Sequence, residues 1–93
     1  MSGEIARDRP IAIASGFRLQ WEDSQEAHVL LYPEGMVRLS ESAGAILSRC
    51  DGERTLDGVL DSLHEAFPGA DLDADVIEFV TIALEKGWIE LAR

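Results

Sequence analysis

The chain has 93 residues and a formal net charge of −10 at pH 7, with 18 acidic and 8 basic side chains. This length suits one domain with a single core, and no apolar run is long enough to cross a bilayer. The acidic excess is concentrated in residues 55–93. It opposes binding to nucleic acid, which requires cationic side chains that neutralise phosphates. Composition therefore favours a protein partner over a nucleic acid or a membrane.

The N-terminal region carries no recognisable targeting signal, because residues 1–4 lack both a basic cluster and an apolar run. We expect residues 1–9 to be flexible and the whole chain, 1–93, to form one domain. A single cysteine, Cys50, excludes an internal disulfide and suits a reducing compartment. The expected location is cytoplasmic.

The first half of the chain has the patterns of β-strands. Residues 11–14 form a short apolar segment that could cross a sheet or extend a neighbouring one. Residues 17–22 alternate apolar and polar side chains, which indicates a half-buried strand. Residues 27–32 become apolar on both faces, as in a covered strand. A proline turn leads into a third strand at 36–39. Short loops between these three strands predict an antiparallel meander.

A first helix is expected directly after the strands. Ser40 or Ser42 can cap its start by accepting a backbone N–H. Its apolar side chains recur at a spacing of three and four residues, which places them on one helix face. They are Ala43, Ile46, Leu47 and Cys50.

The turn after this helix separates the strand pattern from the helical pattern. Asp51–Gly52 is predicted to stop the first helix, because glycine accepts the left-handed backbone that often follows a helix end. Thr55 is predicted to cap a second helix over residues 56–66.

A third helix is predicted to start within residues 71–75 and to end before Gly87, with a short strand at 88–91. Its apolar arc is wider than a single buried stripe requires, and Ile82 lies among polar neighbours. This surplus has two interpretations. It reflects either tight packing in a small domain, or a groove for a partner beside Phe79 and Ile82.

These elements predict an α+β fold in which a three-stranded antiparallel sheet is followed by a three-helix bundle, like a winged helix-turn-helix domain. A winged-helix transcription regulator is therefore the alternative function. The third helix argues against it, since its four acidic residues outnumber its single lysine and would repel phosphate.

No catalytic or metal-binding pattern is visible. His28 and His64 have no cysteine or carboxylate at the spacing of metal ligands. Cys50 lies on an apolar helix face, which favours a buried thiol over a nucleophile. We therefore expect no enzymatic activity, no metal and no cofactor.

Several separate motifs carry a family resemblance. They are Leu30-Leu31-Tyr32-Pro33-Glu34-Gly35, Ala43, Ile46-Leu47, the run from Cys50 to Thr55, Asp75-Val76 and Gly87-Trp88-Ile89. In order and spacing these motifs resemble the D proteins of pyrroloquinoline quinone (PQQ) biosynthesis, the PqqD family. The resemblance covers roughly residues 9 to 91.

The resemblance implies a peptide chaperone, of the kind called a RiPP recognition element because it binds ribosomally made and later modified peptides. Such a chain would bind the PQQ precursor peptide and present it to a radical S-adenosylmethionine (SAM) enzyme, which cross-links a Glu and a Tyr of the peptide. In related recognition domains the leader peptide adds as a strand beside the third strand, against the third helix.

The residues themselves indicate the same place. A short strand at a sheet edge offers unpaired backbone groups for β-augmentation, and the third helix has surplus apolar surface. Arg38 is either a partner for an acidic peptide side chain or a solvated strand residue. Glu78 or Glu85 could pair with a basic one. The predicted peptide-binding residues are Met36, Val37, Arg38, Leu39, Val76, Phe79 and Ile82.

Two further contacts are predicted from exposure alone. Glu53 and Arg54 are polar and are not needed for the turn, which makes them candidates for contact with the partner enzyme. Residues 11–14 and 36–39 could also pair with a second copy of the chain. The chain is thus expected to be a monomer, or a homodimer formed by strand pairing or exchange.

Overall fold

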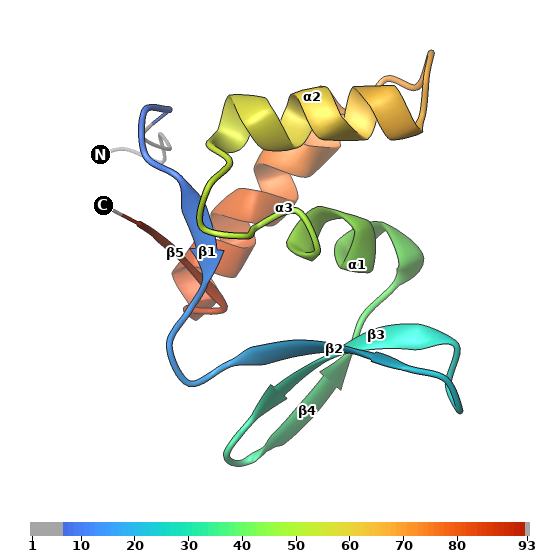
Figure 1. Ribbon diagram of the computed structural model, residues 1–93, viewed down its shortest axis with the longest axis vertical. Helices are drawn as coiled ribbons and strands as arrows, with labels where there is room; N and C mark the ends of the chain where they lie inside the picture. The colour runs from blue at the N-terminus through green and yellow to red at the C-terminus, as the bar shows by residue number, and fades with distance from the viewer. Residues whose placement is uncertain (1–6, 93) are drawn as a thin grey trace.

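The computed structural model describes residues 7–92, which form two antiparallel sheets and three helices (Figure 1). The elements in chain order are β1 (Ile11–Ile13), β2 (Arg18–Glu22), β3 (Ala27–Tyr32), β4 (Gly35–Arg38), α1 (Glu41–Leu47), α2 (Leu56–Ala66), α3 (Asp73–Lys86) and β5 (Ile89–Leu91). The predicted α+β architecture, with a three-stranded sheet before three helices, is confirmed.

The three-stranded sheet is the predicted meander, in the order β2-β3-β4. Its register places Leu30 opposite Leu19 on one side and opposite Val37 on the other. Because β3 is the central strand, β4 lies at a sheet edge. β4 ends at Arg38, one residue before the predicted end, and the side chain of Leu39 turns into the core.

The second sheet joins the two ends of the described chain. β1 pairs with β5, with Ile11 opposite Leu91, so the first and last strands lie side by side (Figure 1). The other side of β1 bonds to the turn between α1 and α2. Ile11 donates its N–H to Arg54 O at 2.9 Å, and Gly52 donates its N–H to Ile11 O at 2.8 Å. The sequence indicated both apolar segments but not their pairing.

Three of the predicted helix boundaries are confirmed. The hydroxyls of Ser40 and Thr55 each accept the backbone N–H of the third residue along, at 3.2 and 3.3 Å. Gly87 ends α3 with φ +79°, and the N–H of Trp88 reaches back to Ala83 O at 3.0 Å, which is the Schellman arrangement.

The predicted end of the first helix is wrong. α1 ends at Leu47, and Cys50 donates its N–H to Leu47 O at 3.0 Å in a tighter turn. Gly52 does adopt a left-handed backbone, with φ +83°, but five residues beyond the helix. The left-handed backbone of Gly52 therefore does not end the helix. It directs the N–H of Gly52 toward Ile11 O in β1.

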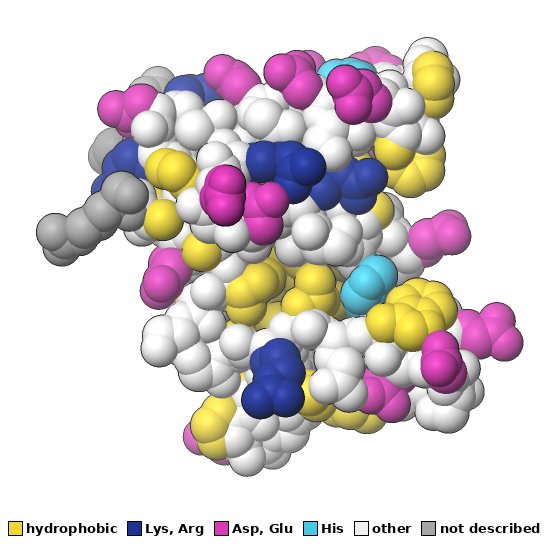
Figure 2. Space-filling model, viewed as in Figure 1, with side chains coloured by type: hydrophobic (Ala, Val, Ile, Leu, Met, Phe, Trp, Pro, Cys, Tyr) yellow, Lys and Arg dark blue, Asp and Glu magenta, His cyan; other side chains and the backbone are white. Residues whose placement is uncertain are grey.

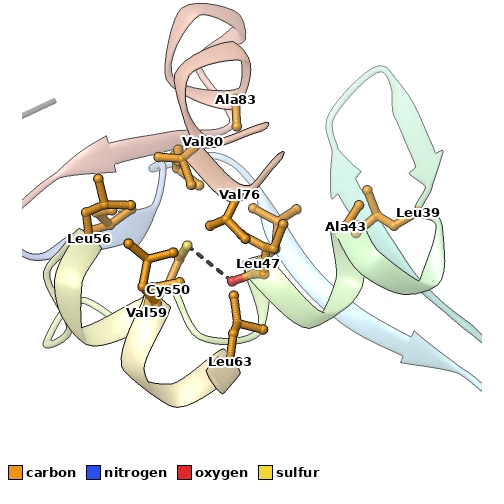
Figure 3. Close-up of a cluster of buried hydrophobic side chains, with 14 of the residues drawn as sticks. Leu39, Ala43, Leu47, Cys50, Leu56, Val59, Leu63, Val76, Val80 and Ala83 are labelled. Carbon is orange, nitrogen blue, oxygen red and sulfur yellow. Dashed lines mark hydrogen bonds between the residues drawn. The ribbon is translucent and has the colours of Figure 1, made fainter. Parts of the chain in front are cut away.

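One cluster of buried side chains joins the helices to both sheets (Figure 3). Fully burying an aliphatic side chain stabilises a fold by about 1.5–3 kcal/mol, so this cluster is the main source of stability. Its members are Ile11, Leu30, Leu39, Ala43, Ile46, Leu47, Cys50, Leu56, Val59, Leu60, Leu63, Val76, Val80, Ala83 and Ile89.

The helical layer meets the sheet where α1 packs on β3. Gly44 of α1 is buried there against the imidazole of His28. A Cβ at position 44 would lie 2.7 Å from His28 Nδ1 and 3.2 Å from His28 Cβ. Since the second of these atoms is fixed to the β3 backbone, the close approach of α1 to the sheet requires glycine.

We therefore expect Gly44→Ala to destabilise the protein by up to about 2 kcal/mol, because a gain of roughly 1 kcal/mol in helix propensity offsets only part of a steric cost of about 1–3 kcal/mol. Gly58→Ala in α2 is the matched control. It has the same gain in propensity, and its Cβ would lie 3.3 Å from Arg54 Cβ in an exposed loop. Urea unfolding of both variants measures the difference. A Gly44→Ala variant as stable as Gly58→Ala would contradict the packing.

The thiol of Cys50 lies within the core and donates to Ile46 O at 3.5 Å (Figure 3). Burial, and then the negative charge of Asp51, raise the pKa of this thiol to about 12. The thiolate, which is the reactive form, is therefore scarce at neutral pH.

We expect native protein at pH 8 to react with a thiol reagent such as dithionitrobenzoate at least about 100-fold more slowly than unfolded protein, since reactivity follows the thiolate population. Absorbance at low and at high urea concentration follows the reaction. Equal rates in the two conditions would show that Cys50 is accessible in the folded chain.

Candidate functional site

The free edge of β4 is the first part of the candidate site. Leu39 donates its N–H to His28 O at 3.0 Å, toward β3. In an antiparallel pair the bonded positions recur at every second residue. Val37 therefore also bonds inward, and the N–H and C=O groups of Met36 and Arg38 point away from β3. These groups could bond to an added strand.

The side chains of residues 36–39 also alternate between exposed and covered positions. Met36 is 49% exposed, and Arg38 is exposed with its guanidinium 3.4 Å from Gln25 O. Val37 is half-buried and Leu39 is buried in the core. Met36 and Arg38 can therefore contact a partner with their side chains, whereas Leu39 cannot without unpacking the core.

The predicted residues of α3 differ in accessibility. Ile82 is 42% exposed, Phe79 is half-buried, and Val76 is only 3% exposed. Ile82 is thus the surplus apolar side chain that the sequence pattern indicated. Val76 packs in the core and reaches the surface only as part of a groove.

This groove lies where the start of α1, the end of α2 and the start of α3 meet, and we call it the helix-end groove. Its volume is about 560 Å³. It begins directly after β4, at Ser40, and Phe79 lies on its α3 side. Its lining residues are Ser40, Glu41, Ser42, Ala43, Ala45, Ile46, Leu63, Phe67, Leu72, Asp75, Val76, Glu78 and Phe79.

Sequence reasoning missed Phe67 as a site residue. It follows Leu63 by four residues, which places it on the apolar face of α2. It lies at the C-terminal cap of the helix, and 47% of it is exposed beside the groove. The following Pro68–Gly69 is the signal that could have identified it, since a helix face is usually incomplete at its last residue.

The predicted enzyme-contact residues lie in the turn between α1 and α2. The backbone N–H groups of Glu53 and Arg54 donate to Asp51 Oδ1 at 3.0 and 3.1 Å and lower the pKa of that carboxyl. Arg54 also forms an ion pair with Asp51 at 2.6 Å. Arg54 therefore makes contacts within the turn that the sequence did not indicate, although the side chains of Glu53 and Arg54 remain exposed.

The histidines have structural contacts. His28 lies edge-on to Trp21, with ring centroids 5.2 Å apart, and His64 Nε2 is 2.7 Å from Asp73 Oδ1. Within residues 7–92, no group of three or more His, Cys, Asp or Glu side chains could hold a metal ion.

Charge is distributed unevenly over the face in Figure 2. Acidic side chains follow the exposed side of α2, and basic side chains gather below it, near the connection between α1 and α2. On α3, four carboxylates stand against one lysine. Among the described residues, no helix is long and apolar enough to cross a membrane.

Comparison with known proteins identifies close sequence relatives. The family model for coenzyme PQQ synthesis protein D (PqqD) matches residues 27–89. A protein of Azotobacter vinelandii named PqqA binding protein is 49% identical over 92 residues, which cover 98% of this chain and 99% of that one. A Klebsiella pneumoniae protein of the same name is 51% identical over 80 residues, covering 85% and 87%.

Two solved structures share the fold. One is the solution structure of the PqqD truncation of Methylobacterium extorquens PqqCD, described as a functional and stand-alone RiPP recognition element. It has a TM-score of 0.74 and 23% identity, and covers 95% of this chain and 96% of that one. The other is the heterocyclase TruD, with a TM-score of 0.69 and 19% identity. Here the match covers 90% of this chain and 12% of that one.

Proposed function

This chain belongs to the PqqD family, and we propose that it is a peptide chaperone of PQQ biosynthesis that binds the ribosomal precursor peptide, PqqA. The names of its relatives support this function. The observation that supports this location is the free edge of β4, where the backbone groups of Met36 and Arg38 are unpaired. An apolar groove begins two residues after this strand, at Ser40. An extended peptide satisfies such an edge by adding a strand.

The peptide backbone supplies affinity and the side chains supply selectivity. Each added backbone hydrogen bond contributes about 0.5–1.5 kcal/mol net, so a short strand alone binds weakly. Apolar peptide side chains rest on Phe79 and Ile82, and Val76 closes the floor behind them. Arg38 pairs with an acidic peptide side chain, and Glu78 or Glu85 with a basic one. Val37 and Leu39 hold the edge strand in place.

In this proposal the chain performs no chemistry and carries no cofactor. It presents the bound peptide to a radical SAM enzyme, and the exposed side chains of Glu53 and Arg54 contact that enzyme. The work takes place in the cytoplasm, where a ribosomal peptide is released.

The working form is a monomer, because a homodimer formed through β4 would occupy the edge that the peptide needs. A dimer through β1 requires opening the chain, since β1 is bonded to β5 on one side and to the α1–α2 turn on the other.

A proline at position 38 tests the edge strand. Arg38→Pro removes an outward N–H but no bond to β3, whereas Arg38→Ala removes only the side chain. We expect Arg38→Pro to bind the precursor peptide about three- to tenfold more weakly than Arg38→Ala, the equivalent of one lost backbone hydrogen bond. Isothermal titration calorimetry gives both affinities, and circular dichroism confirms that both variants fold.

Titration of ¹⁵N-labelled wild-type protein with the precursor peptide locates the contact. We expect amide shifts at residues 36–39 and along the Phe79–Ile82 side of α3. If both segments are unaffected while the peptide binds, the location is wrong. If the peptide does not bind at all, the proposed function is wrong.

A further inference from the structure

We propose that the helix-end groove is a specificity subsite for a peptide segment in which an apolar side chain lies next to a basic one. This inference rests on the proposed function and adds the chemistry of the segment selected. It also adds residues of α1 and α2, which the β4–α3 surface does not include.

The floor of the groove is suited to an apolar side chain. Ile46, Leu63 and Val76 are buried beneath it, while Phe79 is half-buried at its side and Phe67 is exposed at its edge. A volume of about 560 Å³ lies within the range of roughly 300–1,000 Å³ typical of ligand sites. An apolar group that entered would remove the ring of Phe67 from water.

The charges around this floor have one sign. Glu41, Asp75 and Glu78 line the groove, and no lysine, arginine or histidine does. The ion pairs found within residues 7–92 use the carboxylates of Asp51, Asp57 and Asp73 instead. Carboxylates at the edge of a concave apolar surface concentrate a negative potential there. The groove therefore favours a cation beside the apolar group and disfavours an acidic segment.

The groove lies next to the proposed peptide-binding edge of β4, so we assign the precursor peptide as its occupant. Ser40 and Glu41 line the groove and follow Arg38 in the chain by two and three residues. A peptide strand paired with β4 that continues past Arg38 therefore reaches the groove without a long connection. Phe79 belongs to both the proposed α3 contact surface and the lining of the groove, so one continuous peptide segment could occupy the β4 edge and the groove in sequence.

Removal of charge without change of shape tests the electrostatic part. The double variant Asp75→Asn/Glu78→Gln is compared with Asp61→Asn/Glu65→Gln, which loses the same two charges from the exposed face of α2, outside the groove. Titration calorimetry with the precursor peptide at low and high salt measures each affinity. We expect about a fivefold loss at low salt for the groove variant, a smaller loss at high salt, and less than about a twofold change for the control.

A set of peptide variants identifies the cation. Each basic residue of the precursor peptide is replaced by glutamine in turn. One replacement should weaken binding to wild-type protein about fivefold and leave binding to Asp75→Asn/Glu78→Gln nearly unchanged, as a double-mutant cycle requires for a direct pair.

Phe67→Ala tests the apolar part, since its exposed position makes a folded variant expected. We expect about a fivefold loss of peptide affinity with an unchanged urea unfolding midpoint, because the variant removes contact area but no core packing.

Equal affinities of the groove variant, its control and the wild type would overturn the inference. The absence of amide shifts at residues 67, 75 and 78 on addition of the peptide would do the same. If the shifts at residues 36–39 persist in either case, the proposed function stands without the subsite. If the peptide does not bind to the wild type, the proposed function itself fails.

Discussion

The backbone of Ile11 ties the two halves of this fold together. Its N–H and C=O bond to the turn between α1 and α2, at Arg54 and Gly52, while its strand pairs with β5. Its side chain is completely buried in the common core. The first strand of the fold is therefore held between the last strand and the α1–α2 turn. The meander forms a separate sheet in the order β2-β3-β4, so its last strand lies at an edge.

The free edge of β4 can pair either with a second copy of the chain or with a peptide. An unpaired strand edge invites self-association, and β4 carries two outward-pointing sets of backbone groups. Its exposed residues are a glycine, a methionine and an arginine, and the arginine provides the charge that often protects an edge from pairing with its own kind. A peptide partner satisfies the same groups without exposing the core, which is why the edge suits a chaperone.

The acidic residues of the second half of the chain, residues 55–93, determine which class of partner the surface favours. Their carboxylates lie on the outer faces of α2 and α3, where they keep the helices soluble and repel nucleic acid. A helix-turn-helix arrangement that reads DNA needs the opposite sign on its third helix. The same architecture, with an acidic third helix and an apolar groove at its start, is suited to a peptide instead.

The elements that form the proposed site could be predicted from local pattern. Alternation identified β3 and β4, the turn residues fixed their order, and the wide apolar arc of α3 indicated that Ile82 is exposed. The burial of Val76 and Leu39 shows the limit of such patterns. A periodic pattern gives the face on which a side chain lies, but not what covers that face, and both side chains are buried.

The sequence alone determined the order of the elements, the caps at Thr55 and Gly87, a serine cap at position 40 or 42, and the sign of the surface charge, because these depend on neighbouring residues. The tertiary structure decided the pairing of β1 with β5, the role of Gly52 and the exposure of Phe67. Each of these depends on which distant segment comes close. Local sequence does not specify such contacts, since they form only when the helices and both sheets close on one core.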